Sequence, residues 1–348
     1  MQLIGIKTIL GKSALFKFLF FSVYLYIAGS LTYWAMAKFN VQEDGNPDMV
    51  KYIALYQGTP IQEIPKPFCY RVLTPYLARL VPFPEKNPIS GYLDVNKEKI
   101  ILFKFGVVNA LGVAVAGYVL YLLALQFGFS LYESILTSLL YFVSFPTVNY
   151  TVTPLVDALA HAFIAVGLYC VLRQKTWILA MVFALGMFAK ETTILVFLSI
   201  PLLYGIKRQT LILASTCVPG LIGYAVFRFL LFPTDYGYNY PFWETVIRIA
   251  HLFIPGSRML WNLYEIIIAF GPLWIFMGMG FLKIKKVPQH PLLRLSGLTV
   301  VLITACLIIG ENMGRILFLG FPFMIPLAFL GWKSALKYVL IDKEAVAT

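Results

Sequence analysis

The sequence predicts an all-α polytopic membrane protein with about ten transmembrane helices. Hydrophobic residues make up 60% of the 348 residues and charged residues 13%, whereas a soluble domain has about 45–50% apolar and about 25% charged residues. The mean hydropathy is +0.80. The apolar residues gather in runs of about 20, the length at which a helix crosses the hydrocarbon core. These observations exclude a soluble protein and a disordered chain, and four cysteines are too few for a disulfide scaffold.

Ten runs have the composition of a transmembrane helix. They cover residues 18–37, 101–125, 131–149, 154–172, 177–189, 192–206, 210–232, 262–282, 295–310 and 316–332. The fifth and sixth runs are too short to cross the membrane upright, and they meet at Lys190 and Glu191. We expect these two runs to form a short hairpin with a charged tip near one membrane face.

Basic residues in the short loops predict the orientation. Fourteen of the 28 Lys and Arg residues fall on one side of the ten-run arrangement, at the N-terminus, in three short loops and in the C-terminal tail. Short loops rich in Lys and Arg stay in the cytoplasm. We therefore expect both termini to be cytoplasmic. The net charge of +12 then reflects topology and not nucleic-acid binding. The whole chain, 1–348, forms a single transmembrane domain in this interpretation.

Two long loops lie on the outer side, at 38–100 and 233–261. The first contains two stretches with the spacing of an amphipathic surface helix. Their apolar residues are Met49, Tyr52, Ile53 and Tyr56 in one stretch, and Val72, Leu73, Tyr76, Leu77 and Leu80 in the other. The second loop is rich in aromatic residues, namely Tyr236, Tyr238, Tyr240, Phe242 and Trp243. This composition favours an interfacial belt or, alternatively, a platform for a sugar ring or lipid headgroup.

Ionisable residues within or at the ends of the apolar runs gather on the outer side. Such residues are costly in a membrane and indicate functional sites. They are Asp157, His161, Lys190, Glu191, Arg228, Glu265, Glu311 and Arg315. Three acids, Glu43, Asp44 and Asp48, follow the first run closely. Such a mixed set suits an anionic headgroup held by Arg and Lys, next to a polar group that a carboxylate deprotonates.

Three pairs of these residues also have a purely structural explanation. The pairs are Asp157 with His161, Lys190 with Glu191, and Glu311 with Arg315. The first pair, at i and i+4, could form a hydrogen bond that only holds helices together. The second could mark a solvated turn, and the third could be an ion pair at the water interface.

The acids of the first outer loop are candidate metal ligands. Glu43, Asp44 and Asp48 supply oxygen ligands of the type that Mg²⁺ or Mn²⁺ prefers, although carboxylates on one loop are equally explained by solvation. The four cysteines form no C-x-x-C pair, so we expect no zinc or redox site. The sequence also lacks a Walker A motif and a dinucleotide-binding glycine fingerprint.

A series of short motifs runs along the chain in a fixed order. They are Asp48-x-x-x-Tyr52-x-x-x-Tyr56-Gln57-Gly58, Tyr70-Arg71-Val72-Leu73-Thr74-Pro75, Asp157-Ala158-Leu159-Ala160, Lys190-Glu191-Thr192, and Arg315 before Phe321-Pro322-Phe323-Met324-Ile325-Pro326. In order, spacing and membrane side these motifs resemble a bacterial branch of the GT-C superfamily, over about residues 40–332. GT-C proteins are polytopic glycosyltransferases that use polyprenyl-phosphate sugars, and many members of this branch have no assigned activity.

The resemblance implies a glycosyltransferase of the bacterial inner membrane with its site on the outer side. An acid of the first outer loop would act as the base on the acceptor, and Asp48 matches that position best, with Asp44 and Glu43 as rivals. The residues expected to line the substrate site are Arg71, Asp157, His161, Lys190, Glu191, Arg228 and Arg315. The implied partners are membrane lipids, a polyprenyl-phosphate-linked sugar donor and a lipid or glycan acceptor. A single inverting displacement would transfer the sugar.

Two other functions remain open at this point. A flippase for lipid-linked substrates or a small-solute transporter also places ionisable residues inside a helix bundle. The chain shows no clear inverted repeat of the kind that many transporters have. A non-catalytic scaffold of GT-C-like fold is the third possibility. An enzyme should need Asp48 or Asp44, a carrier should depend on Asp157, and a scaffold should tolerate Asn in place of the outer-loop acid.

Overall fold

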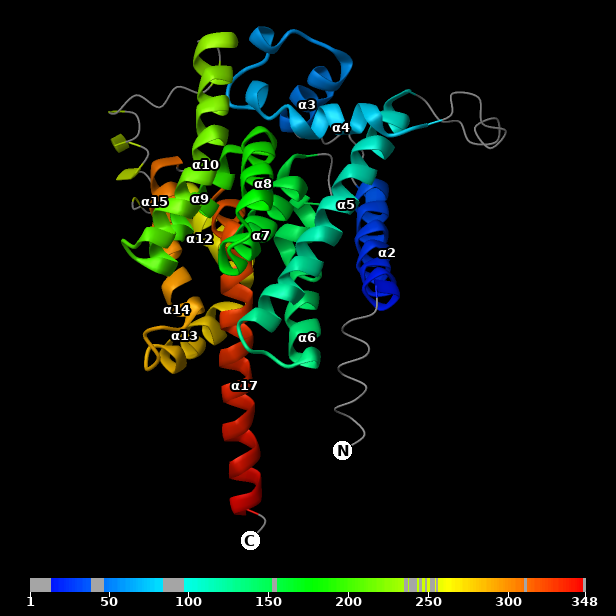
Figure 1. Ribbon diagram of the computed structural model, residues 1–348. Coiled ribbons are helices and arrows are strands. Elements are labelled where there is room, and N and C mark those ends of the chain that lie inside the picture. The colour runs from blue at the N-terminus through cyan, green and yellow to red at the C-terminus, as the bar shows by residue number, and fades with distance from the viewer. Residues whose placement is uncertain are drawn as a thin grey trace.

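The computed structural model describes residues 14–38, 47–83, 97–151, 155–234, 237, 243, 246–247, 249–250, 254, 256–309 and 312–346. Over these residues the fold is all-helical, as the sequence predicts, and no strand occurs among them. The first described helix, α2 (Ala14–Lys38), starts at the end of the bundle where the last, α17 (Phe321–Val346), finishes (Figure 1). Helices α3 (Pro47–Gln57) and α4 (Leu73–Leu80) lie across the opposite end (Figure 1).

Helix α5 (Lys97–Gln126) is the longest element and contacts α2, α6 (Leu131–Phe142) and α7 (Asp157–Arg173). Small residues allow the close approach that packing between membrane helices favours. A β-carbon at Gly112 of α5 would lie 2.8 Å from the carbonyl carbon of Ala158 on α7. The start of α6 is fixed by a capping box, in which Ser130 and Glu133 bond to each other's backbone N–H groups.

Two short helices joined by a charged turn occur where the short hairpin is predicted, and we keep the name hairpin for Thr176–Tyr204. Helix α8 (Thr176–Ala189) and helix α9 (Ile194–Tyr204) have 14 and 11 residues, and the single turn η4 (Glu191–Thr193) joins them. At a rise of about 1.5 Å per residue neither helix reaches across about 30 Å of hydrocarbon. The extended backbone of Lys190 (φ −165°, ψ 134°) ends α8, and Gly205 with a φ of +67° ends α9.

The C-terminal half is built from broken helices. Helix α10 (Arg208–Val226) continues into a wide turn, η5 (Phe227–Leu231). The remaining elements are α12 (Ser257–Phe270), α13 (Leu273–Ile284), α14 (Pro291–Leu295), α15 (Leu298–Ile309), α16 (Met313–Leu317) and η6 (Phe318–Gly320). Gly271, with a φ of +52°, lies at the break between α12 and α13, whose axes differ by 64°. Helix α16 and η6 lead directly into α17.

Among the described residues, five helical segments are long and apolar enough to cross a membrane. They are Ala14–Met36, Lys99–Gln126, Arg208–Leu231, Pro291–Ile309 and Met313–Leu336. A sixth results if the bent pair α12 and α13 is one span. The other predicted runs also fall on helices, but α6, α7, α8 and α9 are shorter than 18 residues. These lengths and compositions fit a membrane protein, and the count of ten is not confirmed.

Both stretches with amphipathic spacing in the first long loop form helices, α3 and α4. Arg79 joins them, since its Nε donates to the Tyr56 carbonyl (2.6 Å) and its Nη2 to that of Leu55 (2.7 Å). Between the two helices the chain makes two short turns, η1 (Ile61–Glu63) and η2 (Phe68–Tyr70). In the second outer loop, Trp243 has a described backbone, whereas the other four aromatic residues lie outside the described residues.

Candidate functional site

A pocket of about 280 Å³ lies between the first outer loop, the hairpin tip and the α15–α16 break. Its charged lining consists of Asp48, Lys66, Arg71, Lys190, Glu191, Arg228 and Arg315. Its apolar lining includes Phe68, Ile309, Ile316 and Leu319. The structure thus brings together six of the residues that the sequence marks as a site, although they come from five separate segments of the chain.

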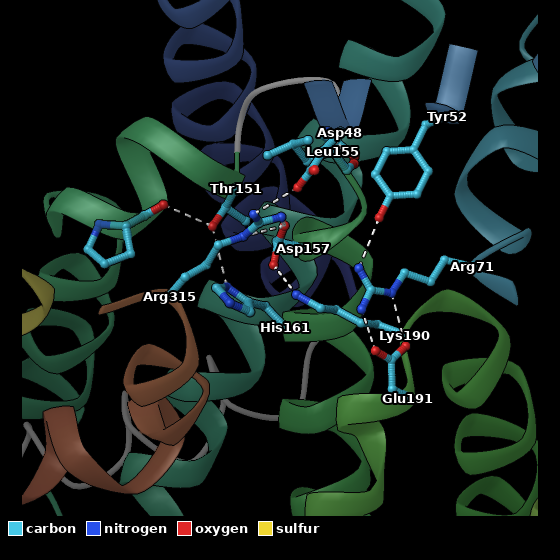
Figure 2. Close-up of polar contacts among 12 residues, drawn as sticks. Asp48, Tyr52, Arg71, Thr151, Leu155, Asp157, His161, Lys190, Glu191 and Arg315 are labelled. Atoms are coloured by element: carbon cyan, nitrogen blue, oxygen red, sulfur yellow. Dashed lines mark hydrogen bonds and ion pairs between the residues drawn. The ribbon is translucent and has the colours of Figure 1, made fainter. Parts of the chain in front are cut away.

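Asp157 lies beneath the pocket and holds two of its basic side chains. It is the first residue of α7, its side chain is 1% exposed, and it does not line the pocket itself. Oδ1 accepts a hydrogen bond from Nζ of Lys190 (2.6 Å), and Oδ2 accepts from Nε of Arg315 (3.1 Å) and from its Nη2 (Figure 2). The positive end of a helix dipole favours a carboxylate at this position.

Arg315 joins Asp157 to the predicted base. Its Nη1 lies 3.3 Å from Oδ2 of Asp48, so the guanidinium lies between the two carboxylates (Figure 2). Asp48 is in the first turn of α3, and its side chain keeps 20% of its surface exposed to the pocket side. One carboxylate is therefore buried, whereas the other is accessible to a ligand.

Arg71 forms a second charged unit with Glu191 and Tyr52. Nε of Arg71 donates to Oε2 of Glu191 (2.9 Å), Nη2 donates to Oε1, and Nη1 donates to the Tyr52 hydroxyl (3.2 Å) (Figure 2). Burial raises the pKa of Tyr52 to about 12, although Arg71 works in the opposite direction. Burial also acts to lower the pKa of Arg71, but Glu191 and Tyr52 outweigh it and hold that pKa well above its ordinary value.

His161 lies on the same helix as Asp157 but outside the pocket lining. Its Nδ1 is 3.1 Å from the Tyr141 hydroxyl, and its ring lies against Phe318 and Phe321 (centroid distances 5.5 and 5.1 Å). Asp157 and His161 therefore bond to other residues and not to each other. The predicted hydrogen bond at i and i+4 does not form.

Two further bases, Lys66 and Arg228, line the pocket where the outer loops meet. Arg228 on η5 lies over the Tyr70 ring, with its guanidinium carbon 5.0 Å from the ring centroid. Lys66 forms an isolated backbone bridge with Gly237. Lys66 is not among the predicted site residues, and the available signal was its position four residues before the Tyr70–Pro75 motif.

Some predicted residues are not placed. Glu43, Asp44 and Glu311 lie outside the described residues. Within the described part of the chain, no three His, Cys, Asp or Glu side chains come together as metal ligands. Asp48 instead lies beside Arg315. A site for Mg²⁺ or Mn²⁺ on the first long loop would therefore need Glu43 and Asp44 as further ligands beside Asp48.

Comparison of the chain with protein-family models, with curated proteins and with solved structures finds no match.

Proposed function

We propose that this protein is a membrane glycosyltransferase that moves a sugar from a polyprenyl-phosphate donor to a lipid or glycan acceptor. The observation that carries the proposal is the pocket, where the accessible carboxylate of Asp48 faces five basic side chains. A transferase of this class needs both parts: a base for the acceptor and cations for the departing phosphate. The motif resemblance of the sequence points to the same chemistry.

The proposed reaction is a single displacement. Asp48 accepts the proton of the acceptor hydroxyl while that oxygen forms a bond to the anomeric carbon of the sugar. The bond between this carbon and the phosphate oxygen breaks, and its electron pair leaves with the phosphate. Charge therefore develops on the phosphate, where positioned Arg and Lys side chains stabilise it most. The side of attack inverts the anomeric configuration.

The mixed lining of the pocket supports a lipid donor. Its charged side chains come from α3, the loop after it, the hairpin, η5 and α16, and Ile309, Ile316 and Leu319 add apolar surface. These three residues belong to α15, α16 and η6, which are among the apolar C-terminal helices. An amphiphile fits such a lining, with its anionic group at the charged side chains and its chain along the apolar surface.

The proposal includes a ten-span topology in the bacterial inner membrane, with cytoplasmic termini and the pocket outside. The ion pair between Lys333 and Glu133 supports this arrangement. The sequence assigns both residues to the cytoplasmic side, and α17 brings the first of them to the start of α6. The pocket residues, all assigned to the outer side, likewise come together.

Replacement of Asp48 tests the proposal. Native mass spectrometry of the purified protein first identifies a co-purified polyprenyl phosphate or its sugar ester, whose mass names the donor. Transfer from that donor to membrane lipids or glycans is then measured for Asp48→Asn. Loss of a general base should slow transfer by about 10²–10⁴-fold. The fold should persist, because Arg315 keeps Asp157 as its partner.

Glu133→Gln is the matched control for Asp48→Asn. It also removes a carboxylate from an ion pair with a base, but on α6, away from the pocket lining. We expect wild-type transfer from this variant. Transfer by Asp48→Asn at the wild-type rate would exclude Asp48 as the base, and a wild-type protein that neither binds nor transfers a sugar lipid would refute the proposal.

A carrier is the second candidate, and the broken pair α12–α13 favours it. Discontinuous helices with polar groups are typical of transporter sites. On α12, Asn262 and Glu265 are buried, and neither Nδ2 of Asn262 nor Oε2 of Glu265 has a hydrogen-bond partner among the described residues. Uptake of the co-purified species into sealed vesicles, abolished by Glu265→Gln and retained in Asp48→Asn, would favour the carrier over the enzyme.

A further inference from the structure

Over the described residues, the charges around the pocket do not cancel. Three bases, Arg71, Lys190 and Arg315, are bonded to carboxylates. The described carboxylates bonded to them are also three, namely Glu191, Asp157 and Asp48. These six side chains balance in charge. Lys66 and Arg228 add two positive charges, and no carboxylate among the described residues lies within 4.0 Å of either.

The first long loop contacts Gly237 and the η5 segment next to these two bases. Gly237 pairs with the backbone of Lys66, and a β-carbon at Gly237 would overlap the backbone nitrogen of Lys66. Arg228 lies over the ring of Tyr70, and the Tyr70 hydroxyl donates to the carbonyl of Phe232 (3.3 Å). The protein therefore holds the backbone of Lys66 and the guanidinium of Arg228, and among the described residues neither base has an acidic partner that a ligand must displace.

We infer that Lys66 and Arg228, which we call the rim pair, make the pocket selective for the dianion of a phosphate monoester over the monoanion of a phosphodiester. Two cations that no described carboxylate compensates match a ligand with two negative charges, and a monoanion leaves one of them without a counter-charge. Charge-assisted hydrogen bonds from Lys and Arg to phosphate supply this discrimination.

The inference rests on the proposed function for its chemical meaning. In that reaction the donor is a phosphodiester, and the group that leaves is a monoester with one more negative charge. Selectivity for the dianion is then preferential stabilisation of the charge that develops as the bond breaks. Interactions that are stronger in the transition state than in the ground state are the ones that accelerate a reaction.

Calorimetric titration with three simple ligands tests the inference. The purified protein in a nonionic detergent at pH 8 is titrated with hexyl phosphate, methyl hexyl phosphate and inorganic phosphate. At this pH hexyl phosphate carries two charges, since the second pKa of a phosphate monoester is about 6. Inorganic phosphate, a weaker acid in this step, is mainly the dianion. We expect the wild type to bind hexyl phosphate about tenfold more tightly than the diester, the ratio that one additional charge-assisted contact supplies. At pH 5 this preference should disappear.

Variants of the rim pair test whether Lys66 and Arg228 cause the preference for the monoester. Lys66→Gln/Arg228→Gln should bring the monoester-to-diester ratio close to one, whereas Lys66→Arg should retain it. Lys175→Gln is the matched control, because it removes one charge from an exposed position outside the pocket lining. Gly237→Ala should lower the ratio without removing a charge, since the new β-carbon displaces Lys66. Gly223→Ala should leave the ratio unchanged, because a β-carbon there meets no atom within 4 Å.

The outcomes separate this inference from the proposed function. A ratio that is unchanged in the double variant, or a wild type that binds neither ester, overturns the inference. A wild type that prefers the dianion but transfers no sugar supports the inference and refutes the proposed function. Inorganic phosphate distinguishes the source of the ligand. Affinity equal to that of hexyl phosphate assigns the site to free phosphate, and weaker affinity assigns it to a lipid headgroup. The monoester-to-diester ratio alone supports or overturns selectivity for the dianion.

Discussion

One buried carboxylate, Asp157, organises the basic side of the pocket. A charge in a low-dielectric interior is stable only when it is paired and hydrogen-bonded. Asp157 meets this requirement with two bases from elements far apart in the sequence, Lys190 on the hairpin and Arg315 on α16. The side chains of both bases are thereby fixed in the pocket lining. We regard Asp157 as a residue that positions the cations and does not itself touch a ligand.

The contacts of Arg71 predict how much its replacement lowers the stability of the fold. Arg71→Ala leaves Glu191 and the Tyr52 hydroxyl without their donor. Loss of one partner of a buried pair costs about 3–5 kcal/mol. We expect the lower end of that range, because the Glu191 side chain is 30% exposed. Thermal unfolding in detergent measures the loss. Arg71→Lys should be milder, since the charge stays and only the two-pronged geometry is lost.

A double variant separates the ion pair from other effects at this position. Arg71→Ala/Glu191→Ala removes both charges, so it should recover part of the stability that Arg71→Ala loses. If Arg71→Ala unfolds at the wild-type temperature, or if the double variant is as unstable as the sum of the single ones, the pair does not stabilise the fold.

At the scale of elements, local patterns predicted the helices well and their partners poorly. The spacing of Met49, Tyr52, Ile53 and Tyr56 predicts α3, because amphipathic periodicity is a property of a short window. The local pair of Asp157 with His161 is wrong, because Lys190 and Arg315, 33 and 158 residues away, are the actual partners. Only tertiary packing sets such distant contacts. Lys66 was missed for the same reason, since its neighbour Gly237 belongs to the other outer loop.

The contact between α13 and α17 depends on two glycines, and their replacement should lower the stability of the fold. A β-carbon at Gly331 would overlap the carbonyl oxygen of Phe276, and one at Gly280 would overlap that of Leu327. Small residues at such crossings let membrane helices pack backbone against backbone. Gly331→Ala should therefore destabilise the protein by about 1–3 kcal/mol, the usual effect of overpacking. Thermal unfolding in detergent is the measurement.

Gly278 is the matched control for this crossing. It lies on α13 two residues from Gly280, but a β-carbon there meets no atom within 4 Å. Gly278→Ala should keep the wild-type unfolding temperature or raise it slightly, because alanine favours a helix over glycine. Equal unfolding temperatures for Gly331→Ala and Gly278→Ala would show that the close crossing does not limit stability.

At the scale of the whole molecule, the number of helices that cross the membrane determines on which side each loop lies. The membrane sides of two glutamines therefore test the ten-span arrangement. Gln62 on η1 and Gln289 before α14 are both exposed. The ten-span arrangement places seven crossings between them, an odd number, so they should face opposite sides. If only the long straight helices cross and the bent pair α12–α13 is re-entrant, two crossings separate them and they face the same side.

Cysteine labelling reads this difference directly. The four native cysteines are buried, so a membrane-impermeant maleimide should label the wild type weakly. Gln62→Cys should react in right-side-out vesicles and Gln289→Cys in inside-out vesicles. Reaction of both variants from the same side would contradict the ten-span arrangement. Because the pocket lies next to the segment that carries Gln62, labelling of Gln62→Cys from the cytoplasmic side would also place the site on the cytoplasmic face, where an outward-facing transferase has no access to its acceptor.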